Sequence, residues 1–159
     1  MNRKTRNEKL SALFAEDYRV IDFLPFAVSE KGSNFFEEAE EYFLQDKQLE
    51  DFCNRTIAIV LKVLCYYPFE IYVEEYPPLT GKRTGWLKDK RCELIVKILK
   101  RVILKKKGQI DILLGQEDSI ICISGGVLSI AVYHESDSLR ALLDDIVKTE
   151  GLYYWKYRV

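Results

Sequence analysis

Two runs of β-branched and aliphatic residues, 119–124 and 127–133, are separated by a pair of glycines, Gly125-Gly126. This arrangement is typical of a β-hairpin with a tight two-residue turn. The turn length sets the strand register and predicts that Ile123 pairs with Leu128. In this register one face of the hairpin carries only aliphatic side chains, those of Ile121, Ile123, Leu128, Ile130 and Val132. An apolar sheet face has to be covered, so the hairpin requires helices packed against it.

The rest of the chain supplies helices and further strands. Apolar residues recur at three- and four-residue spacing in segments 35–44, 49–64, 88–107 and 136–150, which predicts four helices. Additional strands are predicted at 18–28, 69–73, 109–114 and 152–157, and a loop at 77–85. Because the clearest strand pair is antiparallel, we predict an α+β fold in which an antiparallel sheet of about four to six strands packs against amphipathic helices.

Composition indicates one globular domain over residues 1–159, with the polar residues 1–9 as a flexible tail. Of the 159 residues, 48% are hydrophobic, yet no apolar segment is long enough to span a bilayer. No apolar signal region follows the basic start of the chain. The four cysteines form no CxxC pair, and we expect no metal site and no cofactor. These features predict a cytoplasmic protein that does not bind membranes.

Residues that would indicate catalysis are sparse. His134 is the only histidine, and it precedes Glu135 and Asp137. It is open to two interpretations, a general base beside these carboxylates or a strand end that leads into a helix capped by Ser136. No G-x-S-x-G elbow and no phosphate-binding loop of Walker spacing is present. We therefore expect a protein that is not an enzyme.

Charge is strongly segregated along the chain. Residues 30–51 hold eight acidic side chains and two lysines, a net charge of −6. Residues 82–107 hold eleven basic side chains and two acidic ones, a net charge of +9. The whole chain has a net charge of only −1, so the two blocks either neutralise each other in the fold or form separate binding surfaces.

Each block suggests a binding surface. The acidic one predicts a partner-binding face made by Glu37, Glu38, Glu41 and Tyr42, since clustered negative charge speeds the capture of a basic partner. The alternative is a nucleic-acid-binding surface on the basic helix 88–107, with Lys97, Lys100 and Arg101 as its contacts and Trp86 nearby. Because the net charge of the whole chain is slightly negative, we rank this alternative second.

The acidic segment Phe-Phe-Glu-Glu-Ala-Glu-Glu-Tyr-Phe-Leu at 35–44, the antiparallel strands and the end segment 150–155 together resemble bacterial toxin-immunity proteins of the polymorphic or contact-dependent type. That resemblance implies a small cytoplasmic, non-enzymatic α+β protein. Such a protein neutralises a cognate toxin domain, often a basic nuclease, through acidic and aromatic residues. The basic helix 88–107 departs from this pattern.

Overall fold

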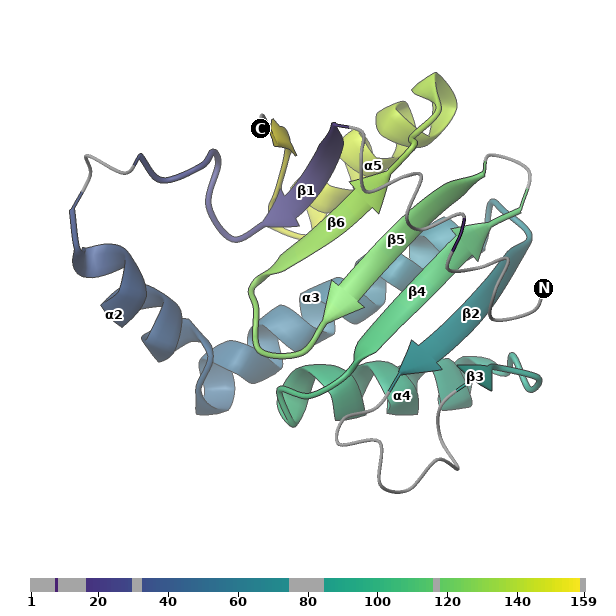
Figure 1. Ribbon diagram of the computed structural model, residues 1–159, viewed down its shortest axis with the longest axis horizontal. Coiled ribbons are helices and arrows are strands. Elements are labelled where there is room, and N and C mark those ends of the chain that lie inside the picture. Colours follow the sequence, from purple (N-terminus) through teal and green to yellow (C-terminus); the bar gives the residue numbers. More distant parts are fainter. Residues whose placement is uncertain (1–7, 9–16, 30–32, 75–84, 116–117, 158–159) are drawn as a thin grey trace.

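Seven strands form one antiparallel sheet in the order β3-β2-β4-β5-β6-β1-β7 (Figure 1). The structure, a computed structural model, describes residues 8, 17–29, 33–74, 85–115 and 118–157. The strands are β1 (Tyr18–Asp22), β2 (Phe69–Glu74), β3 (Gly85–Trp86), β4 (Gln109–Leu114), β5 (Ser119–Ser124), β6 (Ser129–Tyr133) and β7 (Tyr153–Tyr157). The α+β class is confirmed, and the sheet has one strand more than the upper limit of the prediction.

The additional strand is the two-residue β3, which pairs with β2 through Tyr72 and Trp86. The sequence predicts a loop at 77–85, but Gly85 belongs to β3. The rest of the predicted loop lies outside the described residues. The tail predicted for residues 1–9 also lies outside them, apart from Glu8. Within the described part of the chain, no helix combines the length and the apolar character needed to cross a membrane.

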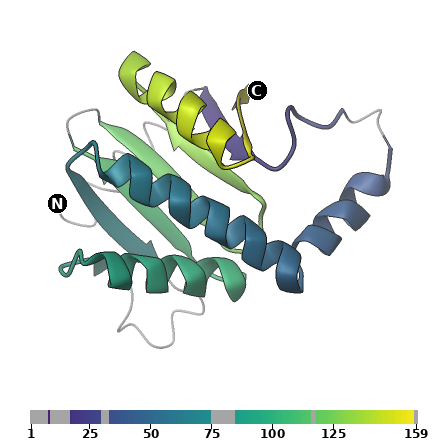
Figure 2. The ribbon, with the colours of Figure 1, turned by 180° about the vertical axis from the view of Figure 1, so that it is seen from behind.

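Three helices cover one face of the sheet, and α3 lies between α4 and α5 (Figure 2). They are α3 (Asp46–Leu64), α4 (Cys92–Leu104) and α5 (Asp137–Thr149). The 19 residues of α3 make about five turns, as the apolar periodicity predicts. Helix α2 (Phe35–Phe43) stands away from the sheet at the start of α3 (Figure 1).

The main core lies between the sheet and these three helices. Side chains alternate between the two faces of a strand, so every second residue of the central strands enters this core. The aliphatic hairpin face predicted from the sequence is buried there, with exposures of 0–2% for Ile121, Ile123, Leu128, Ile130 and Val132. The opposite sheet face holds a smaller cluster of Leu113, Ile120, Cys122 and Tyr133.

The predicted hairpin register is wrong by two residues. Ile123 pairs with Ile130 and not with Leu128, so the connection is a four-residue loop, 125–128. A two-residue primed turn requires positive φ at its first central residue, and type I′ at both, whereas Gly125 lacks it and only Gly126 has it, at +85°. Leu128 enters the core instead of the ladder. Because the error is two residues, the same side chains still face the helices.

Gly125 explains why the turn differs. The chain that leaves α4 passes directly against it, and a Cβ added there would lie 2.3 Å from Lys107 N and 2.6 Å from Val102 O. Its amide also donates to Gly108 O at 2.9 Å. Gly125 is therefore needed for a close contact between the hairpin loop and the end of α4, a non-local constraint that turn statistics do not contain.

Several element boundaries also differ from the prediction, among them the start of α3 at Asp46 and the end of α4 at Leu104, and two of the differences have a local cause. The first strand ends at Asp22 and not at 28. At this end the Asp22 carboxylate accepts from the Phe23 amide at 2.7 Å, and Pro25 follows. The basic helix begins at Cys92 and not at 88, because Asp89 accepts from the Arg91 amide at 3.1 Å and holds a turn there. In both places a short aspartate side chain satisfies the backbone locally.

We predict that Gly125→Ala lowers the free energy of unfolding by about 1–3 kcal/mol, because the new methyl group collides with backbone atoms that cannot move independently. Gly115→Ala is the matched control, since the nearest atom to its added Cβ is Pro68 O at 3.9 Å. Urea unfolding of both variants measures the difference. Equal stability of the two variants would show that the loop is not fixed by the end of α4.

Candidate functional site

Helix α2 is attached to the body of the protein mainly by one side. The ring of Phe23, which follows β1, lies 5.4 Å from that of Phe43 and 6.4 Å from that of Phe36. None of the nine residues of α2 is buried. Helix α2 therefore gains little from the core, although it is amphipathic.

The structure places all four residues predicted for the acidic site on this exposed helix. Glu37 and Glu41 are four residues apart, and Glu38 and Tyr42 are as well, so the side chains form two adjacent rows. Glu37, Glu38 and Glu41 are exposed, and none forms an ion pair with a residue in the described ranges. Tyr42 is 57% exposed, and its hydroxyl accepts from Gln48 Nε2 at 2.8 Å.

Phe35 belongs to the same surface, which sequence reasoning missed. It precedes Glu38 by three residues and is 62% exposed. The signal was present, because Phe35 and Tyr42 both lie off the apolar stripe that Phe36 and Phe43 share. We call Phe35, Glu37, Glu38, Glu41 and Tyr42 the α2 surface.

The α2 surface combines clustered like charges with exposed aromatic side chains, and neither property alone favours the folded state. Glu37 and Glu38 lie in the first turn, where they complement the helix dipole. Glu41 receives no such support and repels its neighbours by a few tenths of a kcal/mol. Large exposed aromatics beside such charges are typical of protein-binding surfaces, where aromatic side chains act as anchors.

The residues of the alternative site lie on another helix. Lys97 and Lys100 are exposed on α4, and Arg101 is partly buried. The acidic and basic blocks adjoin between α3 and α4. Burial raises the pKa of the Cys53 thiol to about 11, with Lys100 lowering it and Glu50 raising it.

Trp86 does not share a surface with these basic residues. Its ring packs edge-on against Tyr72, with the centroids 5.1 Å apart, in the cluster on the sheet face opposite the helices. The structure therefore does not bring together the aromatic and the basic residues of the predicted nucleic-acid site.

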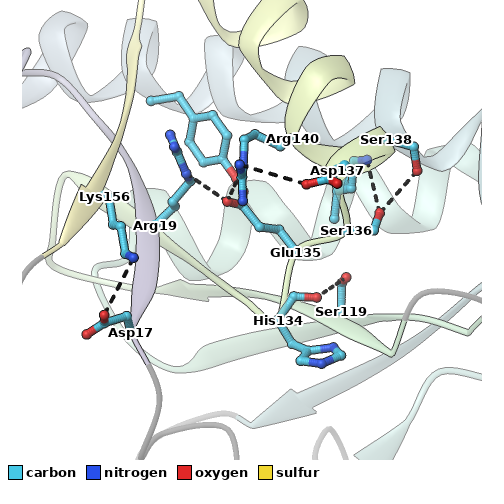
Figure 3. A network of polar contacts seen from close by, with 12 residues as sticks. Asp17, Arg19, Ser119, His134, Glu135, Ser136, Asp137, Ser138, Arg140 and Lys156 are labelled. Carbon is cyan, nitrogen blue, oxygen red and sulfur yellow. Dashed lines mark hydrogen bonds and ion pairs between the residues drawn. The ribbon is translucent and has the colours of Figure 1, made fainter.

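A third feature is a polar cluster around Glu135 (Figure 3). Its carboxylate oxygen Oε1 forms an ion pair with Arg19, 2.7 Å from Nε, and accepts a hydrogen bond from Arg140 Nε at 2.8 Å, while Oε2 accepts from the Tyr154 hydroxyl. The Arg19 guanidinium also lies over the Tyr154 ring, 5.1 Å from its centroid. The cluster joins β1, β7, α5 and the chain between β6 and α5.

Burial raises the pKa of Tyr154, and the Glu135 carboxylate raises it further. Glu135 also raises the pKa of Arg140 through their hydrogen bond. The tyrosine therefore stays protonated and Arg140 stays charged beside a carboxylate with a side-chain exposure of 10%. No single sequence motif contains these four residues.

His134 is not part of this cluster. Its backbone adopts φ +54° and its carbonyl accepts from Ser119 Oγ at 2.6 Å, while its exposed ring points away from Glu135 (Figure 3). The Ser136 hydroxyl accepts from the Leu139 amide at 3.1 Å and caps α5, as predicted. This geometry favours the interpretation of 134–137 as the entry to a capped helix.

The described residues include no group of three or more His, Cys, Asp or Glu side chains placed to hold a metal ion. Cys53 and Cys122 are buried, Cys65 and Cys92 are exposed, and all four are free thiols. Comparison of the chain with protein-family models, curated proteins and solved structures finds no match.

We predict that Tyr154→Phe destabilises the fold by about 1–3 kcal/mol, because Glu135 Oε2 loses its donor in a half-buried site. Tyr153→Phe is the matched control, since Tyr153 is 48% exposed. The pKa of Tyr154 is raised above its ordinary 10.0, so its contribution is complete below that pH and is lost as the pH rises further. The difference between wild type and Tyr154→Phe in urea unfolding should therefore narrow at alkaline pH. A difference in free energy of unfolding that stays constant with pH would contradict a stabilising hydrogen bond from Tyr154 to Glu135.

For the basic helix we predict only weak retention of the protein on immobilised DNA at low salt, because the exposed lysines of α4 are not joined by Trp86 and the net charge is −1. The triple variant Lys97→Glu, Lys100→Glu, Arg101→Glu should change this little. Tight retention that falls steeply with salt and disappears in the variant would make nucleic-acid binding the leading hypothesis.

Proposed function

We propose that this chain is a protein-binding module that captures a basic partner through the α2 surface. One observation carries the proposal: α2 presents three carboxylates and two large aromatic side chains to solvent and buries none of its nine residues. Stabilisation of the fold alone does not account for this arrangement.

The two kinds of side chain would act at different stages of binding. Clustered carboxylates attract a cationic partner over a distance of about 10 Å at ordinary salt and so raise the association rate. Phe35 and Tyr42 would then be desolvated in the contact, where aromatic anchors contribute most of the affinity. The partner implied is a domain with a basic surface and apolar pockets.

We propose further that the partner is a cognate bacterial toxin domain and that the chain is a non-enzymatic, cytoplasmic immunity protein. The acidic and aromatic segment 35–44 and the end segment 150–155 support this, because they resemble immunity proteins. Segment 35–43 is exposed on α2, which fits the way such an inhibitor would contact a basic nuclease. Nucleic-acid binding by α4 is the second candidate, supported by the exposure of Lys97 and Lys100.

The test removes charge from the α2 surface without changing its shape. The variant Glu37→Gln, Glu38→Gln, Glu41→Gln is compared with Glu93→Gln, Asp144→Asn, Asp145→Asn, which removes the same charge from exposed sites on α4 and α5. The probe is a toxin domain with a basic surface, taken from a gene adjacent to this one where the genome carries such a gene, and its association is followed by surface plasmon resonance at several salt concentrations. We expect the α2 variant to associate about tenfold more slowly and to lose most of its salt dependence.

The control variant should associate like the wild type, and both variants should keep wild-type thermal stability. In cells that co-express the toxin domain, the α2 variant should protect less well than the wild type, whereas the control variant should protect equally well. An unchanged association rate for the α2 variant, with binding intact, would overturn the assignment of the surface. The absence of any binding or protection by the wild-type protein would overturn the assignment of the partner.

A further inference from the structure

A cavity of about 300 Å³ opens beside the Glu135 cluster, and none of its lining residues belongs to α2. Arg19, Arg140 and Lys156 line it together with two carboxylates, Asp17 and Glu135. The basic side chains come from β1, α5 and β7, so the cavity exists only in the folded protein. Its lining carries more positive than negative side chains.

The hydrogen bonds of the cluster leave donors available on both arginines. Each arginine contacts Glu135 Oε1 through its Nε, and Oε2 accepts from the Tyr154 hydroxyl, so neither arginine forms a two-bond fork with the carboxylate. A guanidinium has five N–H donors. Among the described residues, the Nη atoms of Arg19 have no acceptor, and Arg140 Nη1 lies 3.9 Å from Asp137, beyond hydrogen-bond distance.

The arrangement also concentrates positive charge more than the fold requires. Arg19 and Lys156 are direct cross-strand partners in the β1–β7 pair, and like charges in such positions repel. Lys156 is offset only by Asp17, at 3.5 Å and with both side chains more than half exposed, so that ion pair is weak. The N-terminal end of α5 adjoins the cluster through Ser136 and adds a further positive potential.

We propose that this cavity binds the phosphate group of a small molecule, as inorganic phosphate or as a phosphate monoester. Two guanidinium groups and an ammonium group reach the cavity from three elements, and a tetrahedral oxyanion can accept from all of them. A carboxylate has only two oxygens in one plane and would leave donors unused. Arg19 and Arg140 supply the paired donors, and Lys156 supplies the third charge. This site is independent of the proposed partner binding by α2.

The experiment titrates the full-length protein with sodium phosphate by isothermal titration calorimetry, with sodium acetate at matched ionic strength as the comparison. Glycerol phosphate is titrated separately to distinguish a monoester from the free ion. The variants are Lys156→Gln and Arg140→Gln, with Lys97→Gln on α4 as the matched loss of one exposed positive charge. Lys156→Gln leaves the Glu135 hydrogen bonds in place, so it tests the site even if Arg140→Gln disturbs the fold.

We expect saturable phosphate binding and no saturable acetate binding. Lys156→Gln and Arg140→Gln should each weaken phosphate affinity about tenfold, the effect of losing one charge-assisted contact, while Lys97→Gln leaves it unchanged. Tighter binding of glycerol phosphate than of phosphate would identify a monoester as the ligand, and the reverse would identify the free ion. Absence of saturable phosphate binding, equal binding of acetate, or an equal loss in Lys97→Gln would overturn the proposal.

Discussion

The packing of three helices on one aliphatic sheet face determines where every other feature lies. Ile21, Ile112 and Val132 are fully buried beneath this layer. Because α3, α4 and α5 fill that face, α2 has no apolar sheet surface left to cover (Figure 2). It is held by contacts to Phe23 at its edge, and its remaining aromatic side chains stay in solvent. The exposure of the α2 surface is therefore a consequence of a core that is complete without it.

The separation of charge along the sequence becomes a separation between helices. The acidic residues of α2 and the basic residues of α4 lie on different helices, and the blocks approach each other between α3 and α4, where Glu50 and Lys100 both act on the Cys53 thiol. A net charge of −1 therefore conceals two fields of opposite sign. Since Lys97, Lys100, Glu37, Glu38 and Glu41 all remain exposed, neutralisation within the fold does not consume them.

Local periodicity was enough to predict the class of fold, the five-turn α3 and the buried face of the hairpin, because these depend on which residues share a side. The hairpin register was not predictable in this way, since Gly125 is fixed by a contact with Lys107 that turn chemistry does not reveal. Four residues of the α2 surface, Glu37, Glu38, Glu41 and Tyr42, were grouped from the sequence because they lie within one helix, whereas Phe35 was not included. The Glu135 cluster could not, because Arg19 of β1 and Tyr154 of β7 meet the segment of Glu135 and Arg140 only in the folded sheet.

Glu135 stabilises the cluster of Arg19, Arg140 and Tyr154, and its negative charge opposes the binding of an anion beside it. Its carboxylate holds Arg19, Arg140 and Tyr154 together and so joins both ends of the chain's described part to α5. A carboxylate at this position would ordinarily weaken an anion site, but Tyr154 occupies one of its oxygens with a neutral donor. Both arginines then share the other oxygen through Nε alone, and their remaining N–H groups stay directed elsewhere. The Tyr154 hydroxyl and the two Nε groups thus hold the carboxylate, and N–H groups of the arginines that do not contact Glu135 remain as donors for the proposed ligand.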